Sequence, residues 1–366
     1  MKIVAFYLPQ FYENEYNNKW WGEGYTDWVA AKNAQPLFRG HNQPRIPLDN
    51  NYYDLSDRDA SVWKWQTDLA KEYGIYGFCI YHYWFAGKKV LDKPVEILRD
   101  HPEIDIHYSF CWDSSSWKRN WYGHTREQEI LIEQDYGDAR MWEQHFNDLL
   151  PYFLDERYIK IENKPVFHIY KTADIPCIDE MKKCWDRLAK EHGFDGVYLI
   201  SGDLGDRDNE HKGINAYYNY EPNHIFHQYY SSWDVQRSVI RAGIIKRINK
   251  YFGTSFFPDK RSAKKSYRLI EKGKESNNKK TFLGIFSDYD DTPRRQLKGT
   301  IYYQNKPKYF EHCLKKQIEK SKEMGNEFLF ITAWNEWGEG AYLEPDERLG
   351  TTYLEIIQKV LRKSNG

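Results

Sequence analysis

Two glutamates near the end of the chain, Glu336 and Glu339, have the residue type and the spacing that acid and base chemistry needs. They follow Phe328 to Thr332, an apolar run whose aromatic and β-branched composition predicts a buried strand. Residues three apart in a strand point to opposite faces, so both carboxylates can share one site only if the backbone turns between them. Gly338 and Gly340 allow such a turn.

The side chains around this pair indicate what the carboxylates act on. Trp334 and Trp337 can stack on the apolar face of a sugar ring, and Asn335 lies between them in the chain. Two carboxylates at the end of a buried strand suit general acid and base work on a glycosidic bond. An isolated pair of glutamates at this spacing is more often a solvated loop beside core tryptophans, so that interpretation stays open.

The elements that must position the pair can be predicted from hydrophobic periodicity. Eight apolar runs read as strands: Ile3–Tyr7, Gly77–Phe85, Ile106–Trp112, Pro165–Tyr170, Gly196–Ser201, Ala216–Tyr220, Thr281–Phe286 and Phe328–Thr332. Helical spacing lies between or after them, at 59–73, 92–100, 141–154, 177–191, 309–324 and 352–361. The alternation predicts an α/β fold, a (β/α)8 barrel that forms one catalytic domain over residues 1–366. The segment from Phe11 to Asp49 has little periodicity and is predicted to be a long loop rich in aromatic residues.

Polar and aromatic side chains recur just after the predicted strands, as with Asp203 after the fifth strand. In a barrel the carboxyl ends of the strands converge on one face, where barrel enzymes bind their substrates. We therefore expect catalysis from Glu336 and Glu339. Substrate contact is expected from Tyr7, Gln10, Trp21, Trp28, His82, Trp84, Trp112, Asp113, Tyr170, Tyr220, Asp288, Arg294, Trp334, Asn335 and Trp337.

Several of these residues have a plainer alternative. A histidine at a strand end, such as His82, is often a core residue or supports a neighbouring side chain. Asp290 and Asp291 are expected to belong to a turn with a local ion pair, whereas Arg294 or Arg295 can bind substrate hydroxyls or a phosphate.

Composition narrows the class of function. A formal net charge of −1 argues against a protein built for nucleic acid, while an aromatic content of 17% favours surfaces that hold carbohydrate rings. Five scattered cysteines form no metal-binding pattern, and they indicate free thiols and a cytoplasmic protein. The sequence has no apolar run long enough to span a membrane and no nucleotide-binding or metal-binding motif, so no cofactor and no required metal are expected.

One segment departs from this balanced charge. Between Lys246 and Lys280 there are twelve Lys or Arg residues against three acidic ones. A solvated, partly helical insertion is the ordinary interpretation, since charge runs usually face water. The alternative is a contact for a phosphate-bearing partner or a peripheral contact with a membrane surface.

Five stretches, in order along almost the whole chain, resemble a known family: YLPQFYENEYNNKWWGEGYTDW, QPRIPLDNNYYDL, KEYGIYGFCIYHYWFAGKK, DYDDTPRR and ITAWNEWGEGAYLEPD. The family is the WbsX-like one, described as glycosyltransferases of bacterial surface-polysaccharide loci. It is related to the glycoside hydrolase family 99 endo-α-mannosidases, which carry a similar NEWxEG motif. The resemblance implies a barrel enzyme with an oligosaccharide or polysaccharide substrate.

The resemblance also implies roles for the two glutamates. Glu339 would be the acid that protonates the glycosidic oxygen and later activates water. Glu336 would be the base that removes the proton of the substrate's own 2-hydroxyl, so that a 1,2-anhydro sugar forms. The chain departs from the hydrolase pattern at Gly338, where the hydrolases have a histidine; the departure bears on the sugar and leaves the carboxylate pair in place.

Three functions are compatible with these observations. Hydrolysis or transglycosylation of a bacterial surface polysaccharide, such as a lipopolysaccharide O-antigen, comes first. A glycosyltransferase that uses an activated sugar donor is the second, and a glycan-binding protein without catalysis is the third. The products separate the first two, because a donor-dependent enzyme leaves a nucleotide or a lipid phosphate behind.

Overall fold

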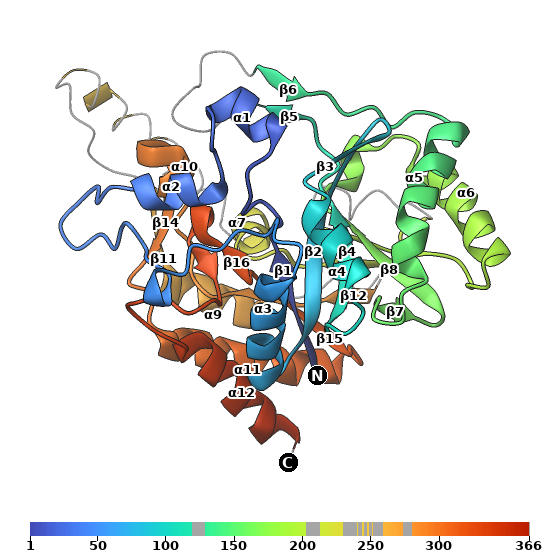
Figure 1. Cartoon of the computed structure of the whole chain (residues 1–366). Helices are drawn as coiled ribbons and strands as arrows, with labels where there is room; N and C mark the ends of the chain where they lie inside the picture. Colours follow the sequence, from blue (N-terminus) through green and yellow to red (C-terminus); the bar gives the residue numbers. More distant parts are fainter. Residues whose placement is uncertain are drawn as a thin grey trace.

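The computed structural model describes residues 1–118, 129–202, 213–229, 259–273 and 280–365, with isolated positions between 240 and 251. Asp203 and part of the segment 246–280 lie outside the described residues. Within the described part, parallel strands surround one axis (Figure 1). They are β1 (Lys2–Tyr7), β2 (Ile75–Phe85), β4 (His107–Trp112), β8 (Lys164–Ile169), β9 (Tyr198–Ser201), β10 (Ala216–Tyr218), β12 (Lys280–Phe282), β13 (Gly284–Phe286) and β15 (Phe328–Thr332).

The sheet runs almost completely round because its seventh strand is shared between two neighbours. β12 pairs with β10, with Tyr217 opposite Thr281, and β13 pairs with β15, with Ile285 opposite Ile331. Only Leu283 separates these two short strands. The order is therefore β1, β2, β4, β8, β9, β10, β12 with β13, and β15, which pairs with β1 again. The predicted (β/α)8 architecture is confirmed.

Burial on both faces explains why the strands are continuously apolar. In β1, the residues from Ile3 to Tyr7 are all fully buried. Phe6 points into the barrel, where its ring lies 5.4 Å from that of Tyr218 and 5.9 Å from that of Phe330. Helices cover the outer face, so neither side of a strand meets water and alternation with polar residues is absent.

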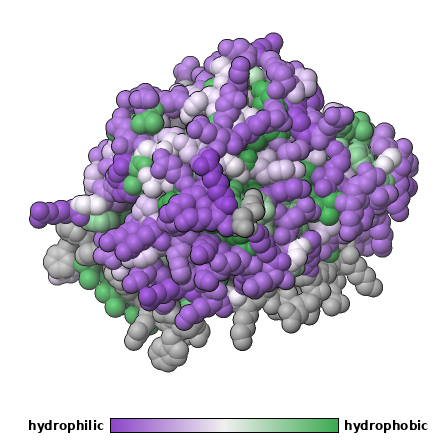
Figure 2. Space-filling view, turned by 90° about the horizontal axis from the view of Figure 1, so that it is seen from below, coloured by the Kyte–Doolittle hydropathy of each residue, from purple (hydrophilic) through white to green (hydrophobic). Residues whose placement is uncertain are grey.

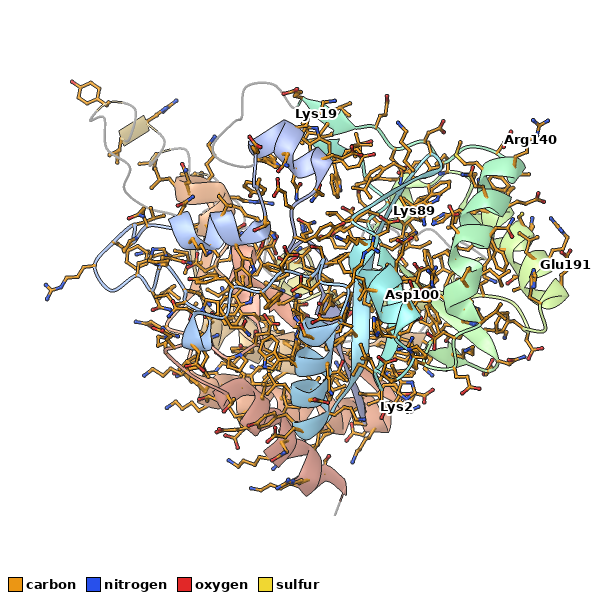
Figure 3. The ribbon with its side chains drawn as sticks, in the orientation of Figure 1. Lys2, Lys19, Lys89, Asp100, Arg140 and Glu191 are labelled. Atoms are coloured by element: carbon orange, nitrogen blue, oxygen red, sulfur yellow. The ribbon has the colours of Figure 1, made fainter. Side chains whose placement is uncertain are left out.

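All six predicted helices are present, and a seventh packs beside them. They are α3 (Ser61–Glu72), α4 (Lys93–Asp100), α5 (Ala139–Phe153), α6 (Ile178–Glu191), α11 (Pro307–Glu323), α12 (Thr352–Asn365) and the additional α9 (Ala263–Lys272). Their outward faces are polar, and the underside of the molecule is mostly hydrophilic with scattered apolar residues (Figure 2). Charged residues of the outer helices, such as Arg140 and Glu191, point away from the barrel (Figure 3).

The loop predicted from Phe11 to Asp49 contains two helices, so that prediction was wrong in part. α1 (Glu15–Trp21) begins where the Asn14 side chain accepts a hydrogen bond from the Asn17 backbone, and α2 (Asp27–Asn33) follows it. Two turns are too short to show helical periodicity. The remaining short helices are α7 (Asn223–Tyr229), α10 (Thr292–Arg295), η1 (Leu48–Asn50), η2 (Thr172–Asp174), η3 (Gln296–Lys298) and η4 (Trp337–Glu339).

Further short strands decorate the barrel. They are β3 (Lys88–Val90), β5 (Trp117–Lys118), β6 (Ile130–Ile132), β7 (Lys160–Ile161), β11 (Asp259–Ser262), β14 (Thr300–Tyr303), β16 (Asn335–Glu336) and β17 (Ala341–Tyr342). In Figure 3, Lys2 at the start of β1 lies at the lower end of the barrel and Lys19 of α1 at the upper end. The upper end therefore carries the carboxyl ends of the strands, the expected face for a site.

The described part of the basic segment is integral to the fold. β11 pairs with β14, and α9 buries Tyr267, whose hydroxyl donates to the carbonyl oxygens of Phe286 and Ser287. For residues 259–272 this corrects the expectation of a solvated insertion, because an apolar face of α9 packs against the barrel while its lysines face outward.

Three further observations concern the cysteines, membrane spans and metal sites. All five cysteines are free thiols. Among the residues that the structure describes, no helix could cross a membrane, and no cluster of His, Cys, Asp or Glu is arranged to hold a metal ion.

The seventh strand provides a test of the barrel. A Cβ at Gly284 would lie 1.9 Å from the backbone oxygen of Asn219, at the point where the strand changes partner. We expect Gly284→Ala to lower the free energy of unfolding in urea by about 2–4 kcal/mol, because backbone must move. Gly193→Ala is the control: it meets no atom within 4 Å and carries only the strain of its positive φ. Equal losses in both variants would contradict the close approach.

Candidate active site

The turn that the two glutamates require is present. β16 holds Asn335 and Glu336, η4 carries the chain from Trp337 to Glu339, and β17 returns antiparallel to β16. Gly340 ends the turn with a φ of +59°, a left-handed conformation that favours glycine. The single 3₁₀ turn brings both carboxylates to the same cavity.

One buried guanidinium, that of Arg294, joins these carboxylates to a third. Its Nη2 lies 3.0 Å from Oε2 of Glu336, and its Nη1 lies 3.2 Å from Oε1 of Glu339. Nε and Nη2 also donate to Oδ1 of Asp27, at 3.0 and 2.9 Å. Arg294 comes from α10 and Asp27 from α2, so three loops above the barrel meet at this cation.

Gly338 is what admits the guanidinium. A Cβ at this position would lie 2.4 Å from Nε of Arg294 and 2.9 Å from Oδ2 of Asp27. Any side chain there would displace the cation or the carboxylate that holds it.

Burial, together with an excess of carboxylates over the one guanidinium, raises the proton affinity of Glu336, the more buried glutamate of the pair. Burial raises the pKa of Glu336 to about 8; Arg294 opposes the shift, while Glu339 and Asp27 add to it. The contact between Glu336 Oε2 and Arg294 lacks the alignment of a hydrogen bond. Glu339 is more open, with 22% of its side chain exposed against 6% for Glu336. Both carboxyls line the cavity, and Glu336 is the more deeply buried of the two.

A second buried carboxyl, Glu344, holds the turn from behind. Oε2 accepts hydrogen bonds from the Trp337 indole at 2.7 Å and the Tyr53 hydroxyl at 3.0 Å, and Oε1 accepts one from Gln66 at 2.7 Å. Gln66 in turn accepts from the Tyr7 hydroxyl. Burial raises the pKa of Glu344 to about 7, although these donors oppose the shift. This network fixes Trp337, and with it the turn that carries Glu336 and Glu339.

Asn335 joins the turn to the first strand. Its Oδ1 accepts a hydrogen bond from the Leu8 backbone at 2.7 Å, and its Nδ2 donates to the Leu8 carbonyl oxygen at 3.1 Å. The amide thus takes the place of a strand neighbour just beyond the end of β1. Asn335 positions the turn and does not line the cavity.

A cavity of about 530 Å³ opens above the carboxylates. Eight of the predicted site residues line it: Gln10, Trp21, Asp113, Tyr170, Tyr220, Arg294, Glu336 and Glu339. Other aromatic and charged side chains complete the wall, among them Trp20, Tyr81, Tyr83, Trp117, Arg261, Tyr289, Asp291, Arg295 and Tyr302. The structure therefore brings both predicted catalytic residues and six of the predicted binding residues to one place.

The other nine predicted residues do not line this cavity, and the expectation that they face a substrate is corrected. They are Tyr7, Trp28, His82, Trp84, Trp112, Asp288, Trp334, Asn335 and Trp337. Most are large rings that complete the core: Trp28 donates to the Tyr53 carbonyl oxygen, Trp112 to that of Trp84, and the Trp334 ring packs 5.1 Å from Phe78. These side chains point away from the cavity, and the spacing of residues in the sequence does not reveal that direction.

His82 and Asp288 show the same distinction among polar residues. The Nε2 atoms of His82 and His145 lie 2.9 Å apart, and Trp84 stacks 4.1 Å from the His145 ring. Burial lowers the pKa of both histidines, so this pair is neutral and belongs to the core. Asp288 lies 3.0 Å from Arg45, and its other oxygen accepts from the Tyr289 backbone.

Two acidic residues were missed or misjudged by sequence reasoning. Asp27 gave one signal, its place next to Trp28 in the motif GYTDW, but its partner Arg294 is 267 residues away. Asp291, expected to be part of a turn, does pair with Arg295 at 3.3 Å and also lines the cavity. Burial raises the pKa of Asp291 to about 7, opposed by Arg295.

Replacement of Arg294 tests the charge cluster. Arg294→Met would leave three buried carboxylates without their cation, and we expect a loss of about 3–5 kcal/mol in the free energy of unfolding at pH 7.5. Without the guanidinium the carboxyls of the folded state bind protons more tightly than those of the unfolded chain. Stability should therefore return as the pH falls from about 8 toward 5.

The matched control is Arg187→Met, which removes an arginine paired with Glu143 and Glu191 on the protein surface. Urea unfolding of this variant should change by less than about 1 kcal/mol. A stability gap between Arg294→Met and wild type that stays constant with pH would contradict the proposed electrostatic role.

Comparisons with known proteins place this geometry in a family. The family described as "Glycosyltransferase WbsX" matches residues 3–357. Two proteins named "Uncharacterized protein WxcX", from two strains of Xanthomonas campestris pv. campestris, are 30% and 29% identical over 99% of this chain. The chain spans about half the length of these curated relatives, 50% in each case.

Solved structures share the fold. The glycoside hydrolase family 99 endo-alpha-mannosidase from Bacteroides thetaiotaomicron superposes with a TM-score of 0.59 at 13% identity, covering 99% of this chain and 97% of the other. A "Glycoside hydrolase-like protein" gives 0.57 at 13% identity, with 98% and 93% covered. The likeness shows a common fold, while the family match covers nearly every residue of this chain. The chain belongs to the family described as "Glycosyltransferase WbsX".

Proposed function

We propose that the protein cleaves or transfers glycosidic bonds of a bacterial surface polysaccharide, with Glu336 and Glu339 as its catalytic residues. The observation that carries the proposal is the pair of carboxylates on one cavity, in contact with the same guanidinium. Aromatic rings and amides on the cavity wall suit a sugar, whose apolar faces stack and whose hydroxyls accept and donate hydrogen bonds.

The reaction is proposed to pass through the substrate's own 2-hydroxyl. Glu339 donates its proton to the glycosidic oxygen while Glu336 removes the proton of the 2-hydroxyl. The 2-oxygen then attacks the anomeric carbon, the protonated leaving group departs, and a 1,2-anhydro sugar forms. In the second step Glu339 takes a proton from water or an acceptor hydroxyl, and the oxygen of that molecule attacks the anomeric carbon. The bond from this carbon to the 2-oxygen breaks, and Glu336 returns its proton to the 2-oxygen.

The different environments of the two glutamates support different roles. Glu339 reaches the cavity and can meet an incoming water or acceptor, as an acid that later acts as a base must. Glu336 is buried, and its pKa of about 8 makes its carboxylate a stronger base than an ordinary glutamate. Arg294 contacts both glutamates. Its positive charge therefore stays beside the pair while one glutamate donates a proton and the other accepts one.

A donor-dependent glycosyltransferase is the second candidate. The family's description favours it, and so do the two further arginines on the cavity wall, Arg261 and Arg295, because an activated donor carries phosphate. A glycan-binding protein without catalysis would keep the aromatic wall but would have no use for the buried carboxylate cluster.

A screen for new reducing ends tests the reaction. Wild type and Glu339→Gln are incubated with bacterial surface polysaccharides and α-linked oligosaccharides, with no donor added. We expect wild type to release reducing ends and Glu339→Gln to be about 10²–10⁴-fold slower, because the proton donor is lost. Glu323→Gln, on the outer end of α11, is the control and should retain wild-type turnover.

The outcomes separate the three functions. Release that is equal in Glu339→Gln and wild type would reject Glu339 as the acid. If wild type releases nothing but transfers sugar from a nucleotide-sugar panel, the donor-dependent enzyme replaces the hydrolase. Glycan binding without turnover in either assay would favour the binding protein.

The pH dependence of turnover tests the role of Glu336. If Glu336 is the base, it must be ionised, so the acidic limb of the kcat/KM profile should rise through a pKa near 8. Asp27→Asn removes a neighbouring carboxylate that raises this pKa, so the acidic limb should move to lower pH. A profile that falls through pH 8 would instead assign Glu336 as the acid.

A further inference from the structure

The walls of the cavity differ in character on two opposite sides. In the barrel order, β4 is the third strand and β12 with β13 is the seventh, so four places separate them in a ring of eight. The segments that follow these strands therefore lie across the mouth of the barrel from each other. In Figure 1, β5 lies beside α1 at the top, and β11 and β14 lie at the left.

The side that follows β4 is aromatic. The Trp117 ring lies 5.0 Å from that of Tyr83 and 5.7 Å from that of Trp20, and its indole donates to Asp113 at 2.9 Å. Gln10 donates to the Tyr83 hydroxyl. The one lysine on this side, among the residues described, is Lys118 at the rim. Flat rings with amide and carboxylate groups between them suit the binding of a sugar ring.

The opposite side carries Arg261, which neighbouring groups hold in place. Arg261 belongs to β11, in the segment before the seventh strand, and β11 pairs with β14, which follows that strand. Its guanidinium lies 3.6 Å from the centre of the Phe226 ring, and its Nη1 donates to the Tyr302 hydroxyl at 3.3 Å. Asp259 pairs with Nε and Nη2 on the other edge. Only 17% of the side chain is exposed, so the cation is fixed and largely shielded from water.

Arg295 stands on the same wall and is more open. Its Nε lies 3.3 Å from Oδ2 of Asp291, and 48% of its side chain is exposed. Asp291 also accepts a hydrogen bond from the Thr300 backbone at the start of β14. β14 pairs with β11, where Arg261 lies opposite Tyr302. One short pair of strands thus supports both arginines.

These two arginines differ from Arg294 in what surrounds them. Three carboxylates contact Arg294, so its charge is more than balanced inside the protein. Arg261 and Arg295 each pair with one carboxylate, and both also line the cavity. A guanidinium presents several N–H donors in a plane, which matches the oxygens of a phosphate or a carboxylate.

We propose that Arg261 and Arg295 form a subsite for an anionic group, phosphate or carboxylate, that the substrate carries on the side of the cavity opposite the aromatic wall. The sugar that reacts then lies on the aromatic side, with the scissile bond above Glu336 and Glu339. The assignment of the sugar rests on the proposed function, whereas anion binding by the two arginines does not. The inference also gives a role to the basic segment 246–280, to which Arg261 belongs.

Two sources supply this chemistry, and different probes distinguish them. A diphosphate would come from an activated sugar donor, and a carboxylate would come from an acidic sugar within a polysaccharide. Isothermal titration calorimetry of the full chain is carried out with pyrophosphate, with trigalacturonic acid and with the neutral sugar maltotriose, at low salt and in 150 mM salt. We expect at least one anionic probe to bind wild type more tightly than maltotriose, with weaker binding in salt.

Variants assign the binding to the two arginines. Arg261→Gln and Arg295→Gln should each raise the Kd of that anionic probe about tenfold, the loss expected for a charge-assisted contact. Arg187→Gln is the matched control, because Arg187 is half exposed, pairs with acidic neighbours and lies outside the cavity. Its Kd should equal that of wild type. If a glutamine variant fails to fold, Arg261→Lys and Arg295→Lys keep the charge and should bind with an intermediate Kd.

Each outcome decides between the alternatives. Binding of pyrophosphate alone indicates a phosphate donor, binding of trigalacturonic acid alone indicates an acidic glycan, and binding of both supports the shared subsite. If neither anion binds more tightly than maltotriose, or if the glutamine variants bind as wild type does, the proposal is wrong. If wild type binds an anion but turns over no glycan, the proposed function is wrong and the subsite stands. If wild type turns over neutral glycans but binds no anion, the subsite is wrong and the proposed function stands.

Discussion

The upper end of the barrel depends on one buried cation. Arg294 reaches Asp27 from the loop after β1, and Glu336 and Glu339 from the turn after β15, while its own helix follows β13. These three segments have little regular structure to hold them, so the guanidinium is their common contact. Both glutamates of the candidate active site contact this one charge.

Neighbouring ion clusters show how the fold tolerates so many buried charges. Asp290, next to the cavity residue Asp291, lies 2.8 Å from His41 and also accepts hydrogen bonds from Gln43 and Thr292. These partners lower its pKa, in contrast to Asp291, whose pKa burial raises to about 7. Both carboxylates have donors, but Glu339 and Asp290 add to the effect of burial at Asp291, whereas His41, Arg45 and Thr292 outweigh burial at Asp290.

The fold was predictable because it depends on the pattern of hydrophobic residues. The site was predictable only in part, because it depends on the direction in which each side chain points. All eight strand segments were visible as apolar runs, whereas α1 and α2 span seven residues each and leave no periodic signal. Trp21 and Trp84 are alike in the sequence, yet one lines the cavity and the other stacks on His145 in the core. Asp27 could not be recognised from its neighbours, since what gives it a role is a contact across 267 residues.

Gly338 connects the fold to the chemistry. The absence of a side chain at Gly338 leaves room for a guanidinium against the carboxylate pair. A cation at this distance stabilises ionised carboxylates, and the third carboxylate, Asp27, offsets that effect, so the proton balance is set by groups from three loops. Three carboxylates already surround Arg294, so its positive charge is balanced within the protein and attracts an anionic ligand only weakly. In the proposed subsite, the attraction of the cavity for an anion comes instead from Arg261 and Arg295, on the wall that β11, β14 and α10 form, away from the carboxylate pair.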